Sequence, residues 1–84
     1  MSLRFITTAD TEILATAAAV RRLPDDFPEV RCANPGMTRD IEPFLDHVLG
    51  DDARVVVIRV LGGRRGWQGG VDRLAERARE RGIA

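Results

Sequence analysis

The sequence predicts a small α/β domain in which three strands alternate with three helices. Two observations carry this prediction: three segments repeat apolar residues with the helical period, and a shorter, β-prone apolar segment precedes each of them. Strands that alternate with helices are joined by right-handed crossovers and form a parallel sheet with helices on both faces, a three-layer arrangement. The chain has 84 residues, which excludes a large self-contained enzyme and leaves room for a single domain over residues 1–84.

The first strand is expected at Leu3–Thr7, followed by a helix over residues 11–23. Asp10 is placed to cap this helix, because its side-chain oxygen can accept hydrogen bonds from the free N–H groups of the first turn. Pro24 ends the helix, since proline lacks the N–H that a further turn requires. The predicted buried stripe of this helix consists of Ile13, Leu14, Ala17 and Ala18.

A second strand, Val30–Ala33, has apolar residues on one face only, as at the edge of a sheet. The helix that follows is the clearest in the sequence, because five apolar residues fall on one of its faces. They are Ile41, Phe44, Leu45, Val48 and Leu49. Asp40 is the expected cap, and Gly50 suits a left-handed position at the C-terminal end.

The third strand, Arg54–Leu61, is apolar on both faces, which predicts a position inside the sheet with helices on both sides. A third helix follows and ends at Gly82. Its expected buried stripe consists of Val71, Leu74, Ala75 and Ala78. The expected strand order is 2-1-3, as in small sheets of flavodoxin- or Rossmann-like type.

This order leaves the most hydrophobic strand at an edge, unless a fourth strand pairs with it. Residues 83–84 lie where such a strand would begin. We therefore expect an incomplete domain, which is either the N-terminal part of a longer chain or a form that pairs with another chain.

The charge of the chain is balanced overall and uneven along its length. Thirteen arginines and thirteen acidic residues give a net charge of zero, which does not support nucleic-acid or membrane-surface binding. Residues 1–53 hold five arginines against ten acids, whereas residues 54–84 hold eight against three. The single cysteine, Cys32, excludes an internal disulfide, and no segment resembles a signal peptide or a membrane span, so we expect a cytoplasmic protein.

Polar or glycine-rich segments follow all three strands, at residues 7–11, 33–36 and 61–70. In an open parallel sheet these segments meet at the carboxyl edge, where ligands of such folds bind. This edge is therefore the predicted functional face. Its candidate substrate-binding residues are Thr8, Asp10, Asn34, Arg59, Gly62, Gly63, Arg64 and Trp67.

Each candidate with a distinctive side chain also has a structural interpretation. Capping is favoured over ligand binding for Asp10, and packing is favoured over stacking on a flat ligand for Trp67. Arg59 lies in an otherwise apolar strand, where an ion pair with Asp10 or Asp72 is favoured over ligand binding because an unpaired charge is costly. The arginines of the last helix interleave with acids and are expected on a solvated face. They are Arg73, Arg77, Arg79 and Arg81.

The sequence shows no catalytic apparatus of its own. It contains neither a GxGxxG nor a GxxxxGK[ST] motif and no lysine, so nucleotide binding is not expected. One histidine, His47, and one cysteine do not make a dedicated transition-metal site, and the only serine lies at the N-terminus, so a Ser-His-Asp arrangement is not expected either. We expect no cofactor to be bound by this chain itself.

Three segments together resemble the N-terminal end of the CobN family, the large subunits of aerobic cobaltochelatase. They are Phe5–Thr11, Arg31–Pro35 and Val55–Gly63, followed by Trp67 and Gly70. The resemblance spans essentially all 84 residues, and the family is related to the large subunit of magnesium chelatase. Its members are much longer than this chain.

The resemblance implies a part in ATP-dependent insertion of cobalt(II) into hydrogenobyrinic acid a,c-diamide during cobalamin biosynthesis. The implied partners are the remainder of the large subunit, AAA+ ATPase subunits that use Mg-ATP, and a corrin-type macrocycle. Because tetrapyrroles are flat and carry many carboxylates, Trp67 with Arg59, Arg64 and Arg65 is a chemically suitable contact set. The alternative is a non-catalytic α/β module that binds a ligand or a protein; a phosphate-receiving signalling domain is disfavoured, because the third strand runs into two glycines rather than an Asp.

Overall fold

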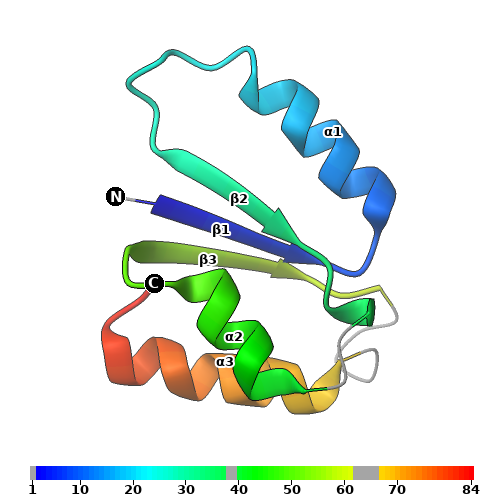
Figure 1. Cartoon of the computed structure of the whole chain (residues 1–84), viewed down its shortest axis with the longest axis vertical. Coiled ribbons are helices and arrows are strands. Elements are labelled where there is room, and N and C mark those ends of the chain that lie inside the picture. Colours follow the sequence, from blue (N-terminus) through cyan, green and yellow to red (C-terminus); the bar gives the residue numbers. More distant parts are fainter. Residues whose placement is uncertain (1, 38–39, 62–66) are drawn as a thin grey trace.

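The computed structural model describes residues 2–37, 40–61 and 67–84 (Figure 1). Its elements follow one another in the predicted strand–helix alternation, with one added turn of 3-10 helix. They are β1 (Ser2–Thr7), α1 (Asp10–Val20), β2 (Glu29–Ala33), η1 (Pro35–Met37), α2 (Ile41–Leu49), β3 (Ala53–Arg59) and α3 (Gln68–Arg81). No described helix is long and apolar enough to cross a membrane.

The three strands form one parallel sheet with the order β2-β1-β3, which confirms the predicted order and fold class. Leu3 of β1 lies opposite Val30 of β2 on one side and opposite Val55 of β3 on the other. Helix α1 lies on one side of the sheet, and α2 and α3 lie together on the other (Figure 1). The chain thus has the expected three layers.

The hydrophobic core lies between the sheet and the α2–α3 pair. Its buried members come from β1, α2, the start of β3, α3 and the C-terminal end. They are Ile6, Leu45, Val48, Leu49, Ala53, Leu74 and Ile83. The three from α2 belong to the predicted stripe of that helix, which is therefore confirmed.

Helix α1 differs from its prediction in burial, length and cap. None of its residues is buried, and Leu14 of the expected stripe is 72% exposed. The helix ends at Val20, earlier than predicted, and its N-cap is Ala9, so Asp10 is its first residue and does not cap it. The least exposed residues of α1 are Glu12, Ile13, Thr16 and Val20, so Leu14, Ala17 and Ala18 fall on its outer side, which no layer of the described residues covers.

The prediction that both faces of β3 are covered is also wrong. Val56 and Ile58 pack against the core, but Val57, which points to the opposite face, is 47% exposed. Helix α1 makes most of its sheet contacts with the other two strands, so the described residues cover this face of β3 only in part. Apolar residues on both faces of a strand show that both faces can be buried. They do not show whether the chain has a helix to cover each face.

The helix ends agree with the sequence at the glycines. Gly50 follows α2 with a φ of 53°, and Gly82 follows α3 with a φ of 67°, both in the left-handed region that favours glycine. Asp40 occupies the predicted N-cap position of α2, although its side chain makes no capping hydrogen bond.

The last two residues lie against the outer edge of β3 and pair with it at one position. Ile83 joins the core, the Ala84 N–H donates to the Arg54 carbonyl at 3.0 Å, and the Val56 N–H donates to the Ala84 carbonyl at 2.9 Å. Figure 1 shows the C-terminus beside the start of β3. As predicted, the chain turns towards the sheet edge after α3. These two hydrogen bonds, which we call the Ala84 rung, pair Ala84 with β3.

Candidate binding face at the carboxyl edge of the sheet

Direct hydrogen bonds tie together the loops that follow the three strands. Thr8, which follows β1, donates its N–H to the Arg59 carbonyl at 3.3 Å, and its Oγ1 accepts the Leu61 N–H at 2.9 Å. Asn34, which follows β2, donates from Nδ2 to Asp10 Oδ1 at 2.8 Å. The structure thus brings four of the eight candidate residues, Thr8, Asp10, Asn34 and Arg59, to one edge.

The Asp10–Asn34 hydrogen bond shows that both side chains help to hold the structure together. Asn34 Oδ1 accepts the Gly36 N–H at 2.7 Å while its amide nitrogen holds the Asp10 carboxylate, so the β2 loop is fastened to the first turn of α1. The carboxylate accepts this bond in place of the predicted capping bonds. Both side chains remain accessible enough at this edge to hydrogen-bond a ligand.

Arg59 is engaged in an ion pair, as favoured from the sequence, but with a different partner. Its Nε lies 2.9 Å from Glu12 Oε2, and the Arg59 side chain is 64% exposed. The other Glu12 oxygen accepts a hydrogen bond from the buried Thr7 hydroxyl at 2.6 Å. Thr7 and Arg59 are paired in register and point to the α1 face, where Glu12 in the first turn of α1 reaches both.

Trp67 is packed, which confirms the favoured interpretation. Its ring meets Phe44 edge-to-face, with centroids 5.6 Å apart and planes at 87°, and it packs against the core at the start of α3. Gly70 lies directly beneath the ring, because a Cβ atom there would be 1.9 Å from Trp67 Cε2. The remaining candidates, Gly62, Gly63 and Arg64, lie outside the described residues, as does Arg65.

The most deeply buried charged residue, Arg4, was not singled out in the sequence. It is fully buried and donates to the Val48 carbonyl at 2.5 Å, to Asp52 Oδ1 at 2.6 Å and to the Ser2 hydroxyl. Desolvation is the largest single influence on the pKa of Asp52 and raises it, but the hydrogen bond and charge of Arg4, a backbone hydrogen bond and the charge of Arg31 together outweigh it, so the pKa is lowered overall. The signal was available, because Arg4 is the one charged residue in a short strand. It lies away from the carboxyl edge and fastens β1 to the end of α2.

Two arginines of α3 bridge to α2 instead of lying on a solvated face. Arg73 pairs with Glu42 and, at 2.6 Å, with Glu76, while Arg77 pairs with both Glu42 and Asp46. The hydrogen bond from Arg73, followed by that from Arg77, lowers the pKa of Glu42. The prediction fails here because the acids of α2 face α3, which the sequence of α3 alone does not reveal.

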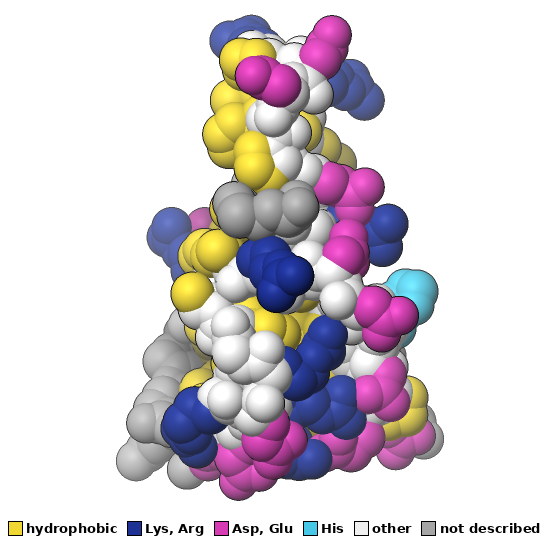
Figure 2. Space-filling model, turned by 90° about the vertical axis from the view of Figure 1, so that its left-hand side faces the viewer, with side chains coloured by type: hydrophobic (Ala, Val, Ile, Leu, Met, Phe, Trp, Pro, Cys, Tyr) yellow, Lys and Arg dark blue, Asp and Glu magenta, His cyan; other side chains and the backbone are white. Residues whose placement is uncertain are grey.

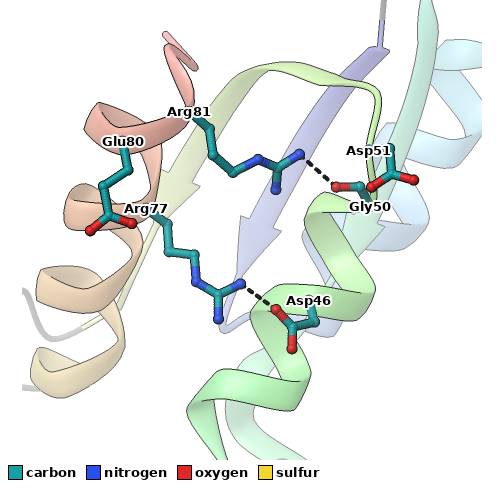
Figure 3. Close-up of a pocket in the computed structure, with 6 residues that line it drawn as sticks. All are labelled: Asp46, Gly50, Asp51, Arg77, Glu80 and Arg81. Carbon is teal, nitrogen blue, oxygen red and sulfur yellow. Dashed lines mark hydrogen bonds and ion pairs between the residues drawn. The ribbon is translucent and has the colours of Figure 1, made fainter.

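One of these bridges, between Arg77 and Asp46, lines an open groove of about 540 Å³ near the C-terminal ends of α2 and α3 (Figure 3). Arg77 reaches Asp46, and Arg81 donates to the Gly50 carbonyl at 2.6 Å, so both guanidinium groups already have partners. Figure 2, which looks from this amino end of the strands, shows arginine and acidic side chains intermingled over the lower half of the molecule. The groove lies where α2 meets α3, and its arginines are already paired. It is at the opposite end of the sheet from the candidate face.

Cys32 and His47 line the same small pocket of about 100 Å³, beside Val48. Burial raises the pKa of the Cys32 thiol, which disfavours the thiolate that a soft metal requires. Over residues 2–37, 40–61 and 67–84, no three His, Cys, Asp or Glu side chains are grouped so that they could hold a metal ion.

Comparison with known proteins gives one informative similarity. The chain is 36% identical to the aerobic cobaltochelatase subunit CobN of Pseudomonas aeruginosa in an alignment of 78 residues, and the match covers 89% of this chain. It resembles a segment of CobN. The chain spans only about 6% of that subunit's length. No family model matches the sequence, and no solved structure matches it. The similarity therefore supports a relationship between this chain and a segment of CobN.

Proposed function

We propose that this chain supports cobalt insertion in cobalamin biosynthesis, as the counterpart of the CobN segment that it matches. The observation that carries the proposal is the 36% identity to CobN across 89% of the chain. In this proposal the substrates are cobalt(II) and hydrogenobyrinic acid a,c-diamide, and AAA+ partner subunits hydrolyse Mg-ATP. The chain contributes binding surface and leaves the chemical step to the rest of the large subunit.

The carboxyl edge is the part of the chain that we assign to the macrocycle. Arg59 is largely exposed, and its guanidinium group can pair with a substrate carboxylate in place of, or beside, Glu12. The amide of Asn34 and the hydroxyl of Thr8 supply neutral hydrogen-bonding groups at the same edge. Trp67 is held by its packing on Phe44 at the start of α3.

A segment exchange tests the proposal. The matched segment of Pseudomonas aeruginosa CobN is replaced by residues 1–84, and the hybrid subunit is combined with its ATPase partners. We expect cobalt insertion to be retained in the hybrid and lost when the segment is deleted. A hybrid that folds and associates with its partners but inserts no cobalt would overturn the proposal.

A pair of arginine variants in the hybrid tests the assigned face. Arg59→Ala is expected to raise KM for the macrocycle about tenfold with little change in kcat, because a pairing with the bound carboxylate is lost. Arg31→Ala is the matched control, since Arg31 is similarly exposed, at 60% against 64%, and is also ion-paired, with Glu29 at 2.6 Å. If both substitutions changed KM for the macrocycle equally, the macrocycle could not be assigned to this edge.

The alternative, a non-catalytic interaction module, is favoured by exposed apolar side chains. Val57 is 47% exposed, Leu61 55% and Leu14 72%, and in this alternative a protein partner covers these apolar side chains. The exchange experiment separates the two functions. An interaction module would restore association of the hybrid with its partners without restoring cobalt insertion.

A further inference from the structure

An apolar groove of about 190 Å³ lies between the outer edge of β3 and helix α3. Val56 and Ile58 form its β3 wall, Leu74 and Ala75 belong to its α3 wall, and Ala84 lies at one end. The groove is lined by apolar residues alone, so an occupant must present apolar side chains to it.

The backbone at Ala84 already defines how a strand pairs here. Its N–H donates to the Arg54 carbonyl and its carbonyl accepts from the Val56 N–H, which is the pattern of a parallel pair with Ala84 opposite Val55. Ile83 is buried in the core, so alternation turns Ala84 to the other face. The first and third positions beyond Ala84 on this line would face the groove, beside Val56 and Ile58.

The edge of β3 offers further hydrogen bonds along the same line. Val56 directs its N–H to Ala84, and residues two apart in a strand point to the same side, so the Val56 carbonyl and the Ile58 N–H also point outward. The described part of the chain supplies neither of these groups with a partner. An exposed edge of this kind pairs with an added strand.

We infer that β3 accepts a fourth parallel strand in line with Ala84, apolar at its first and third positions and supplied by the large subunit of a cobaltochelatase. The source of the strand rests on the proposed function, whereas the register rests on the Ala84 rung. A second copy of this chain does not fit as well, because two β3 edges related by a twofold axis would meet antiparallel, while Ala84 already occupies a parallel rung.

The test uses two ¹⁵N-labelled proteins: the 84-residue chain, and the same chain extended by the eight residues that follow the matched segment in Pseudomonas aeruginosa CobN. We expect amide exchange at Ile58 to be slowed about tenfold or more in the extended protein, because its N–H gains a partner. The Val57 amide, which points towards β1, is the internal reference.

Ala75→Glu supplies the matched variant, since it places a carboxylate in the groove on a partly exposed helix position, and Ala18→Glu makes the same change on exposed α1. The slowing at Ile58 should be lost in Ala75→Glu and kept in Ala18→Glu. Unchanged exchange in the extended protein would overturn the inference. Concentration-dependent slowing in the unextended chain would overturn it too, because a second copy would then occupy the edge. Neither readout requires cobalt insertion, so failure of the proposed function is detected separately.

Discussion

Two leucines on helices that flank the same sheet have opposite fates. Leu49 of α2 is fully buried, whereas Leu14 of α1 is 72% exposed. The α2–α3 side of the sheet holds all the buried hydrophobic residues of the described chain, whereas α1 on the other side has no buried residue and makes polar contacts through its first turn. Helical periodicity identifies both helices, but it does not predict how much of each is buried. In the described chain α2 packs against both the sheet and α3, whereas α1 has only the sheet beside it.

The largest expected difference between the two sides of the sheet comes from truncating these two leucines. We expect Leu49→Ala to lower the free energy of unfolding by about 2–5 kcal/mol, because it leaves a cavity in the core. Leu14→Ala should change it by no more than about 0.5 kcal/mol, since the side chain is already in water. Urea unfolding of both variants measures the difference. A similar loss in both would mean that α1 carries as much of the stability as α2.

Gly70→Ala should have the next largest effect, on the same side of the sheet. The added Cβ would meet the Trp67 ring at 1.9 Å, so the indole must leave its place on Phe44, at a cost of about 1–3 kcal/mol. A shift in tryptophan emission, as water reaches the ring, should accompany the loss. Gly69→Ala is the control, because its Cβ would meet only the flexible end of Ile41, at 3.3 Å. Gly69→Ala destabilising as much as Gly70→Ala would argue against a contact specific to the indole.

The same contrast explains how far the sequence could be interpreted. The strand order, the apolar stripe of α2 and the glycine at Gly82 follow from local patterns, and the structure has all three. The burial of α1 and of Val57 depends on layers outside those segments. Local patterns do not carry that information.

The candidate site divides in a similar way. That the loops meet at one edge follows from parallel topology, which is why Thr8, Asp10 and Asn34 are brought together there. The partner of Arg59 does not follow from topology, because Glu12 reaches it only through the way α1 starts over β1. The sequence shows a charge in the first strand at Arg4 but not the partners of that charge, because Ser2 of β1, Val48 of α2 and Asp52 before β3 converge on it only in the folded chain.

A smaller effect is expected on the α1 side, at Asn34. Asn34→Ala removes the bonds to Asp10 and to the Gly36 N–H at an exposed edge, which should cost about 1 kcal/mol. Amide exchange at Gly36 should quicken while exchange in α2 stays the same, because the core lies on the opposite side. Asn34→Asp keeps the acceptor for Gly36 and loses the donor to Asp10, so it should restore the protection of Gly36. Quicker exchange throughout α2 would show that the two sides are coupled.

The smallest expected effect is the loss of stability in acid when Glu42 of α2 no longer pairs with Arg73 and Arg77 of α3. Arg73 and Arg77 lower the pKa of Glu42 below its usual value of 4.5 in the folded chain, so the folded state binds fewer protons than the unfolded state as this carboxylate titrates. The stabilisation is therefore present above about pH 4.5 and is lost as the pH falls through the lower, folded pKa. Urea unfolding at about pH 6 and about pH 3 should show a smaller loss of stability in Glu42→Gln than in the parent chain. Asp25→Asn, an exposed change in the loop after α1, is the control and should keep the parent's acid sensitivity. If Glu42→Gln kept the full sensitivity as well, the acid response would have to come from elsewhere, with the Arg4–Asp52 pair as the next carboxylate to test, because the pKa of Asp52 is lowered too.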